Sequence, residues 1–330
     1  MTGPAGDGSG EDRLIARFFK PLASDPGALD LADDAAFLTP PPHCDLVLKT
    51  DAIVGGVHFF NDDPPDAIAR KSLRVNLSDL AAKGAKPLGF LLALALPGEI
   101  GDEWLGKFSK GLKEDSEAFG CPLFGGDTDR TPGPVTVSIA MVGAVPKGTM
   151  VRRAGAKPGD RVMVTGTIGD AALGVQLRNG RNINLAPAQR DHLLARYLLP
   201  QPRCALADAI REHASAAMDI SDGLAGDLGK LVRVSGVAAE IAVPKVPLSE
   251  AAKAAVLSDP ALIETALTGG DDYEIVCSAR PGHVAPLRAA AEAAGVRLTE
   301  IGVISAGEGA RFIGADGKAL SFRRASFSHF

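Results

Sequence analysis

Hydrophobic and polar positions along the first half of the chain predict strands that alternate with helices. Apolar runs at 45–50, 88–96 and 134–145, bounded by proline and glycine, are typical of strands. Residues 65–83 and 102–119 instead repeat apolar side chains at helical spacing, and glycines follow both segments. This half is therefore expected to be an α/β domain.

The second half repeats the alternation after a basic segment at 152–160 that is rich in glycine and proline. Helices are expected near 170–179, 187–198, 203–214, 222–235 and 283–294, and strands near 161–166, 216–220, 238–243, 273–279 and 296–304. We expect a flexible tail at 1–11, an N-terminal domain at 12–149 and a C-terminal α/β domain at 150–330, because a fresh strand follows the basic segment.

Composition narrows the class of protein. Of the 330 residues, 46% are hydrophobic and 23% are charged, as in ordinary globular proteins. A net charge of −5 without a long Lys/Arg run argues against nucleic acid or an anionic membrane as a partner. The four cysteines are dispersed, no apolar run is long enough for a bilayer, and the acidic start is unlike a signal peptide. A cytoplasmic protein is expected.

Acidic residues recur where apolar runs end. The stretches are LADDAAFL, LKTDAIVGGVHF, NLSDLAAKGAKP, LFGGDTDR, MDISDGL and TGGDDYEIV. Converging carboxylates about 4 Å apart repel by roughly 4 kcal/mol at an effective dielectric near 20, so convergence would require cations. Oxygen ligands favour Mg²⁺, which is held by one or two carboxylates together with water and substrate phosphates. The pattern therefore favours a magnesium nucleotide, and Gly125 and Gly126 would let backbone N–H groups approach phosphate oxygens.

A structural role competes with this interpretation for each cluster taken alone. Aspartate is common at helix starts and turns, and Asp222 in SDGL would serve as an N-terminal cap. His58, Arg153 and Phe327 also have ordinary alternatives as a structural histidine, a solvated charge and a tail anchor. No P-loop, GxGxxG, kinase signature or GxSxG motif is present, so carboxylates and glycines would have to carry the phosphate chemistry.

The ordered set ADD, TDAIVGGVHF, NLSDLAAKGAKP, GGDTDR, RAGAKPGD, DISDGL and GGDDYE resembles the bacterial thiamine-monophosphate kinase family, over about residues 12–330. The resemblance implies the two-domain fold of aminoimidazole ribonucleotide synthetase, with the N-terminal halves of a homodimer forming a barrel. It implies phosphorylation of thiamine monophosphate to thiamine diphosphate with ATP and Mg²⁺, and an active site between the two halves. The N-terminal domain would bind ATP and Mg²⁺ and form the dimer.

Site residues follow from the same resemblance. The implied metal ligands are Asp34, Thr50, Asp51, Asp79, Asp127, Asp219 and Asp222. The implied ATP contacts are Gly126, Asp127, Arg153 and Ser221, and the implied substrate contacts are His58, Asp271 and Phe327. No general base is expected, since the nucleophile is a phosphate oxygen with a second pKa near 6. The chain departs from the family pattern at Ala32 (usually Gly), Lys49 (often Ser) and Asp271 (usually Glu).

Two rival functions remain open on the sequence. One is another ATP-dependent synthetase of the superfamily, acting on an amide or on selenium. A selenium enzyme is disfavoured because the first cysteine is Cys44, outside the N-terminal tail. The other rival is a sensor that binds metal or nucleotide without catalysis. Such a protein would bind ATP without releasing ADP.

Overall fold

The computed structural model describes residues 13–324 and 326 and divides into two compact units. Unit 1 comprises the chain up to Asn76 together with Pro87–Ala144, and unit 2 comprises Leu77–Lys86 together with the chain from Val145 onward. The expected tail at 1–11 lies outside the described residues. The domain boundary at residue 150 stays a prediction. Within the described residues, no helix is both long enough and apolar enough to cross a membrane.

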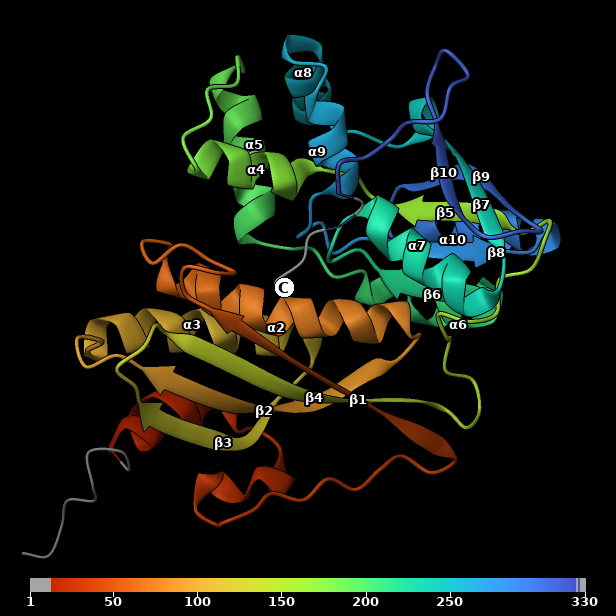
Figure 1. The fold of residues 1–330 in the computed structure, drawn as a ribbon. Helices are drawn as coiled ribbons and strands as arrows, with labels where there is room; N and C mark the ends of the chain where they lie inside the picture. Colours follow the sequence, from red (N-terminus) through yellow and green to blue (C-terminus); the bar gives the residue numbers. More distant parts are fainter. Residues whose placement is uncertain (1–12, 325, 327–330) are drawn as a thin grey trace, which may run out of the picture. The chain divides into compact units, whose positions relative to one another are not determined.

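Unit 1 is built on a four-stranded sheet with strand order β1-β4-β2-β3 (Figure 1). Its elements are β1 (Cys44–Val54), α2 (Pro65–Ala82, whose last turns belong to unit 2), β2 (Lys86–Leu96), α3 (Asp102–Phe119), β3 (Leu123–Arg130) and β4 (Thr136–Pro146). Three short helical turns precede them: Ile15–Phe19, Lys20–Leu22 and Pro26–Leu31. Alternate residues of β2, such as Phe90 and Leu92, are buried, whereas Leu91 between them is 46% exposed.

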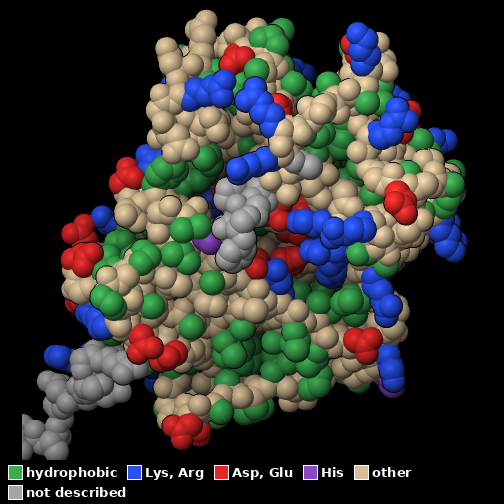
Figure 2. Space-filling view, viewed as in Figure 1, with side chains coloured by type: hydrophobic (Ala, Val, Ile, Leu, Met, Phe, Trp, Pro, Cys, Tyr) green, Lys and Arg blue, Asp and Glu red, His purple; other side chains and the backbone are tan. Residues whose placement is uncertain are grey.

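The other face of this sheet carries exposed apolar side chains, most clearly on β1. Leu46 and Leu48 of β1 are 42% and 74% exposed, although both lie inside a strand. Figure 2 shows hydrophobic side chains gathered on the surface formed by this sheet. A contiguous exposed apolar surface of this kind is typical of a site that binds another molecule.

Unit 2 contains a six-stranded mixed sheet with strand order β10-β7-β9-β5-β8-β6. The strands are β5 (Arg161–Thr165), β6 (Ala216–Asp219), β7 (Ala238–Ala242), β8 (Ile275–Ala279), β9 (Leu298–Ser305) and β10 (Gly309–Ile313). β5 pairs antiparallel with β8 and β9, and β6 pairs antiparallel with β8. β10 runs parallel to β7 at one edge. Asp219 therefore lies at the end of the opposite edge strand, β6.

Two apolar cores and a separate helical group surround this sheet. The helices are α4 (Asp170–Arg178), α5 (Pro187–Leu198), α6 (Ala207–His213), α7 (Leu224–Ser235), α8 (Glu250–Ser258), α9 (Leu262–Thr268) and α10 (Pro281–Ala293). Leu228 of α7 shares one core with Val162 and Val164 of β5, and Ile210 and Leu287 of α6 and α10 share another with Met163 of the same strand. Successive residues of β5 thus point into opposite cores.

The predicted elements agree with the structure at most positions, and α5 covers the predicted range 187–198. The sequence did not predict β10, α8 or α9. Gly101 is the N-cap of α3. The alternative role of Asp222 as an N-terminal cap was wrong, because Gly223 is the N-cap of α7. Gly223 has a φ of 106°, a conformation that aspartate adopts only with strain.

Candidate active site

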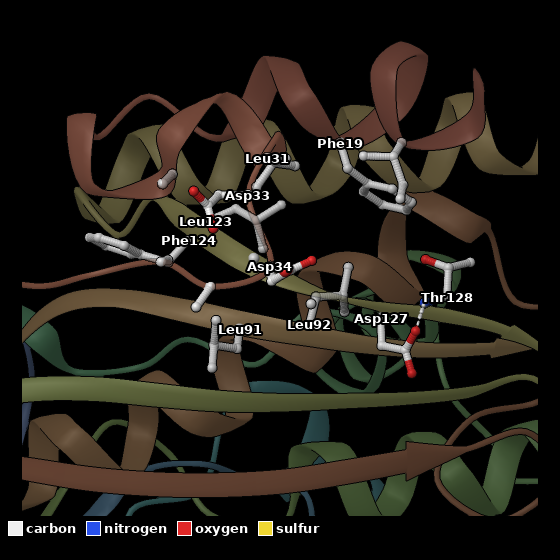
Figure 3. Close-up of a pocket in the computed structure, with 16 residues that line it drawn as sticks. Phe19, Leu31, Asp33, Asp34, Leu91, Leu92, Leu123, Phe124, Asp127 and Thr128 are labelled. Carbon is white, nitrogen blue, oxygen red and sulfur yellow. Dashed lines mark hydrogen bonds between the residues drawn. The ribbon is translucent and has the colours of Figure 1, made fainter. Parts of the chain in front are cut away.

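A pocket of about 490 Å³ in unit 1 brings two of the acidic stretches together (Figure 3). Asp33 and Asp34 line it from the segment after Pro26–Leu31, and Asp127 lines it from β3. The rest of the lining is mainly apolar and includes Phe19, Leu31, Leu91, Leu92, Leu123 and Phe124. The pocket thus offers carboxylate oxygens beside an apolar wall, a combination suited to a nucleotide with bound metal.

Asp127 lies within β3, which does not end at the two glycines. β3 continues through the acidic residues to Arg130, because it pairs parallel with β2 over this stretch. Asp127 stands opposite the exposed Ala93, and its Oδ1 accepts a hydrogen bond of 2.9 Å from the Thr128 backbone N–H. The exposed carboxylate therefore projects from a regular ladder that holds its backbone in place.

Gly126 has a packing reason to be glycine. A Cβ atom there would lie 1.8 Å from the carbonyl oxygen of Leu92 on the neighbouring strand, far inside van der Waals contact. At Gly125 the same atom would meet only the Leu91 side chain, at 3.5 Å. The close approach of β3 to β2 therefore requires Gly126, whatever its contact with a nucleotide.

Thr50 and Asp51 are adjacent on β1, so their side chains point to opposite faces of the sheet. Thr50 shares the exposed face with Leu48, and Asp51 shares the other face with Lys49 and the buried Ile53. Lys49 Nζ lies 2.9 Å from Asp51 Oδ1. The departure from the family pattern at Lys49 thus places a cation on a predicted metal ligand.

His58 lies in the turn after β1, where its backbone N–H donates a hydrogen bond of 2.9 Å to the Val54 carbonyl oxygen. Its Nδ1 accepts a hydrogen bond from the Val54 backbone N–H at 3.0 Å, so that nitrogen carries no proton. Its carbonyl oxygen accepts a hydrogen bond from Lys71 Nζ, also at 3.0 Å, although the Lys71 residue is only 2% exposed. The predicted substrate residue therefore presents Nε2 from a fixed turn.

Unit 2 places Asp219 at the end of β6, and Ser221 and Asp222 in the turn between β6 and α7. Lys230, in the middle of α7, donates hydrogen bonds to Asp222 and to the buried Asp227. Burial raises the pKa of Asp227, and the hydrogen bonds to both carboxylates outweigh burial and raise the pKa of Lys230. Lys230 thus neutralises the two aspartates at this turn.

The remaining predicted residues fall in different surroundings. Asp271 is half-buried, and its backbone N–H donates to the Ser221 carbonyl at 2.9 Å. Asp79 is half-buried in the part of α2 that belongs to unit 2, and Arg153 is exposed. Phe327 lies outside the described residues. Three predicted residues therefore share the adjoining turns of unit 2: Ser221, Asp222 and Asp271.

Comparisons with known proteins match both halves of the chain. The family model described as AIR synthase related protein, N-terminal domain, matches residues 32–145, and the corresponding C-terminal domain matches residues 157–314. A thiamine-monophosphate kinase of Caulobacter vibrioides is 46% identical over 299 residues, which is 89% of this chain and 84% of that protein.

Solved structures of similar proteins point to the same family as the sequence relatives. The crystal structure of a thiamine-monophosphate kinase from Stenotrophomonas maltophilia matches with a TM-score of 0.83 and 38% identity, over 94% of this chain and 96% of that one. The chain belongs to the thiamine-monophosphate kinase family. AaThiL complexed with AMPPCP and TMP matches with a TM-score of 0.77 and 31% identity, over 97% of this chain and 94% of that one. The resemblance and the AIR synthase-like fold expected from the motifs are confirmed.

The predicted metal ligands of this thiamine-monophosphate kinase family member divide between the units. The ligands in unit 1 are Asp34, Thr50, Asp51 and Asp127, and those in unit 2 are Asp79, Asp219 and Asp222. Among residues 13–324 and 326, no three His, Cys, Asp or Glu side chains gather closely enough to hold one metal ion. Mg²⁺ needs only one or two carboxylates when phosphates and water complete its shell, so Asp34 and Asp127 on one pocket fit a magnesium nucleotide.

Sequence reasoning missed several residues around these sites. Asp33 lines the pocket beside Asp34, and the ADD motif contains a signal for it. Lys71 supports the His58 turn, and Arg196 and Arg203 bind the buried Glu274, with no comparable motif to mark them. Their partners lie 13, 78 and 71 positions away, which local patterns do not connect.

Proposed function

We propose that the protein transfers the γ-phosphoryl group of ATP to thiamine monophosphate and forms thiamine diphosphate and ADP. One observation carries the site assignment: Asp34 and Asp127, from separate segments, line one pocket with Gly126. The relatives' names and the AMPPCP and TMP of the AaThiL complex support the substrates. Placement in the cytoplasm is supported by the four cysteines, none of which forms a disulfide.

The reaction is direct in-line transfer. A phosphate oxygen of thiamine monophosphate forms a bond to the γ-phosphorus while the bond from that phosphorus to the bridging oxygen breaks, and ADP leaves with the bonding electron pair. The attacking phosphate is largely ionised at pH 7, so no side chain removes a proton. The protein's work is to hold two anions in line, which can contribute about 7–11 kcal/mol to lowering the barrier.

Each predicted residue has a positioning role in this proposal. Asp34, Asp51 and Asp127 in unit 1, and Asp79, Asp219 and Asp222 in unit 2, would hold Mg²⁺, with Thr50 supplying a further oxygen. Bound Mg²⁺ would neutralise phosphate charge. Gly126, Arg153 and Ser221 would contact ATP, and His58, Asp271 and Phe327 would contact thiamine monophosphate.

We also propose a homodimer formed through the open face of the unit 1 sheet. Leu48 is 74% exposed within a strand, and Leu46 adds apolar surface that a second copy would remove from water. Thr50 shares this exposed face of β1, so the partner would lie close to a predicted ligand. The barrel expected from the family is consistent with this surface.

The deciding experiment measures ADP release by the purified protein with ATP and excess Mg²⁺. Thiamine monophosphate is the test substrate and free thiamine the control. Turnover with the monophosphate only, and thiamine diphosphate as product, would support the proposal. Tight ATP binding without turnover would overturn it and favour a sensor.

A further inference from the structure

The segment that carries Asp271 has a strained backbone. Asp271 has a φ of 74° and Tyr273 a φ of 50°. Positive φ is uncommon outside glycine, and such residues cost on the order of 1–3 kcal/mol each, most clearly when the side chain is bulky. Two of them separated by a single residue persist only where the surroundings hold the turn in place.

The Asp272 side chain anchors this turn to the start of α4. Asp272 is 1% exposed, and its Oδ2 accepts a hydrogen bond of 2.7 Å from the Gly169 backbone N–H. Its other oxygen accepts a longer one, 3.4 Å, from the Ala171 backbone N–H. Both donors lie at the N-terminus of a helix, where the helix dipole favours a carboxylate. The residue between the two strained positions is therefore fixed through its side chain.

Glu274 anchors the other end of the turn. It is fully buried, and it accepts hydrogen bonds from Arg196 at 3.0 Å, from Arg203 Nε at 2.7 Å and from Thr165 Oγ1 at 2.7 Å. Arg196 also lies 3.5 Å from the Asp272 carbonyl oxygen. A buried carboxylate with two guanidinium partners is held in a narrow range of orientations. Arg196 thus connects both anchors.

The strained turn is also registered against the turn that carries Ser221. The Asp271 backbone N–H donates to the Ser221 carbonyl and the Tyr273 backbone N–H donates to the Ile220 carbonyl, both at 2.9 Å. The Ile220 backbone N–H donates to the Glu274 carbonyl at 2.8 Å. The predicted substrate residue and the predicted ATP residue are therefore set side by side by the backbone of unit 2.

We propose that Asp272 and Glu274 are positioning residues, which hold the turn 271–273 so that the Asp271 carboxylate meets the substrate. Neither side chain touches substrate. The inference rests on the proposed function and on Asp271 as the residue that contacts thiamine monophosphate. It explains why two carboxylates that take no part in phosphoryl transfer are buried directly beside a predicted substrate residue.

A double-mutant cycle tests the proposal, with Asp272→Asn, Asp271→Ala and the combined variant. Asp272→Asn keeps one acceptor oxygen, and we expect it to raise the KM for thiamine monophosphate about tenfold at saturating ATP, within the range of couplings between neighbouring residues. The kcat is expected to change less than threefold. The combined variant should have the KM of Asp271→Ala alone, because Asp272 acts through Asp271.

Asp160→Asn is the matched control. Asp160 is also buried in unit 2 and accepts a backbone hydrogen bond, from Lys157 at 3.1 Å, away from the turn. It should lower the melting temperature and leave the KM unchanged. If Asp272→Asn behaves like this control, or if the two effects multiply in the combined variant, the inference is overturned.

Arg196→Lys replaces Asp272→Asn in the cycle if the latter does not fold. The lysine keeps the charge opposite Glu274 but loses the planar group that reaches the Asp272 carbonyl. The inference is supported if Arg196→Lys raises the KM about tenfold in the wild-type background but does not raise it further in the Asp271→Ala background. It is overturned if Arg196→Lys leaves the KM unchanged. A wild-type protein that does not turn over thiamine monophosphate would overturn the proposed function itself and this inference with it.

Discussion

Lys49 Nζ lies 2.9 Å from the carboxylate of Asp51, two residues further along the same face of β1. Both side chains are partly exposed, at 27% and 38%, so solvent screens the pair. Mg²⁺ would have to compete with this ammonium group for Asp51. The departure from the family pattern at Lys49 is therefore expected to weaken Mg²⁺ binding at Asp51.

Lys49→Ser is expected to lower the Mg²⁺ concentration that gives half-maximal activity by up to about fivefold, which corresponds to at most ~1 kcal/mol for a partly exposed pair. A magnesium titration of ADP release measures this. Lys107→Ser, which removes the exposed partner of Glu103, is the control and should leave the titration unchanged. A higher Mg²⁺ requirement in Lys49→Ser would show that Lys49 assists the site.

Asp127→Asn is expected to reduce kcat/KM for ATP at least about 100-fold, because a metal-binding carboxylate in the pocket becomes a neutral amide. Asp129→Asn is the matched control, two residues along the same strand and also exposed, but outside the pocket lining. It should stay within about twofold of wild type. Equal losses in both variants would contradict a specific role for Asp127.

Gly126→Ala is expected to destabilise the fold by roughly 1–3 kcal/mol or more, because its Cβ would lie 1.8 Å from the Leu92 carbonyl oxygen and strand backbone cannot easily move. Gly125→Ala should be tolerated, since its nearest neighbour is a flexible leucine side chain at 3.5 Å. Urea denaturation of the two variants compares them. Similar urea midpoints for the two variants would show that β3 and β2 approach each other less closely at Gly126 than this distance indicates.

The burial of Asp272 leads us to expect that the stability of the protein depends on pH. Burial raises its pKa well above the ordinary value of 3.8, so the folded protein binds this proton more tightly than the unfolded chain. Its contribution to the free energy of unfolding therefore falls as pH rises from about 3.8 through the raised folded pKa. In Asp272→Asn this fall should be absent. Urea denaturation of wild type and Asp272→Asn at a series of acidic pH values measures this. A difference in free energy of unfolding that stays constant with pH would show that the pKa of Asp272 is not raised.

Leu48→Glu is expected to convert the proposed dimer to a monomer, because a charge on the open sheet face would be buried without a partner. Sedimentation velocity reports the change. Leu257→Glu on α8 is the control, since Leu257 is 84% exposed and belongs to unit 2 rather than to this sheet. A wild-type monomer, or a Leu48→Glu dimer, would argue against this interface.

The sequence by itself determined most elements and the acidic stretches. The period of apolar residues is a local property, so α5 and the strands around Met163 and Met218 could be predicted from their own residues. α8, with alanine at four of its nine positions, has little contrast between faces and was missed. The motif set was also sufficient to indicate the family.

Only the tertiary structure decided which side chains meet. Pairing with β2 extended β3 through Asp127 and made Gly126 a point of close backbone approach, which depends on a strand some 30 residues earlier. Glu274 gained Arg196 and Arg203 from positions more than 70 residues away. Such contacts depend on the packing of distant segments, and a buried charge is stable only where that packing supplies its partner.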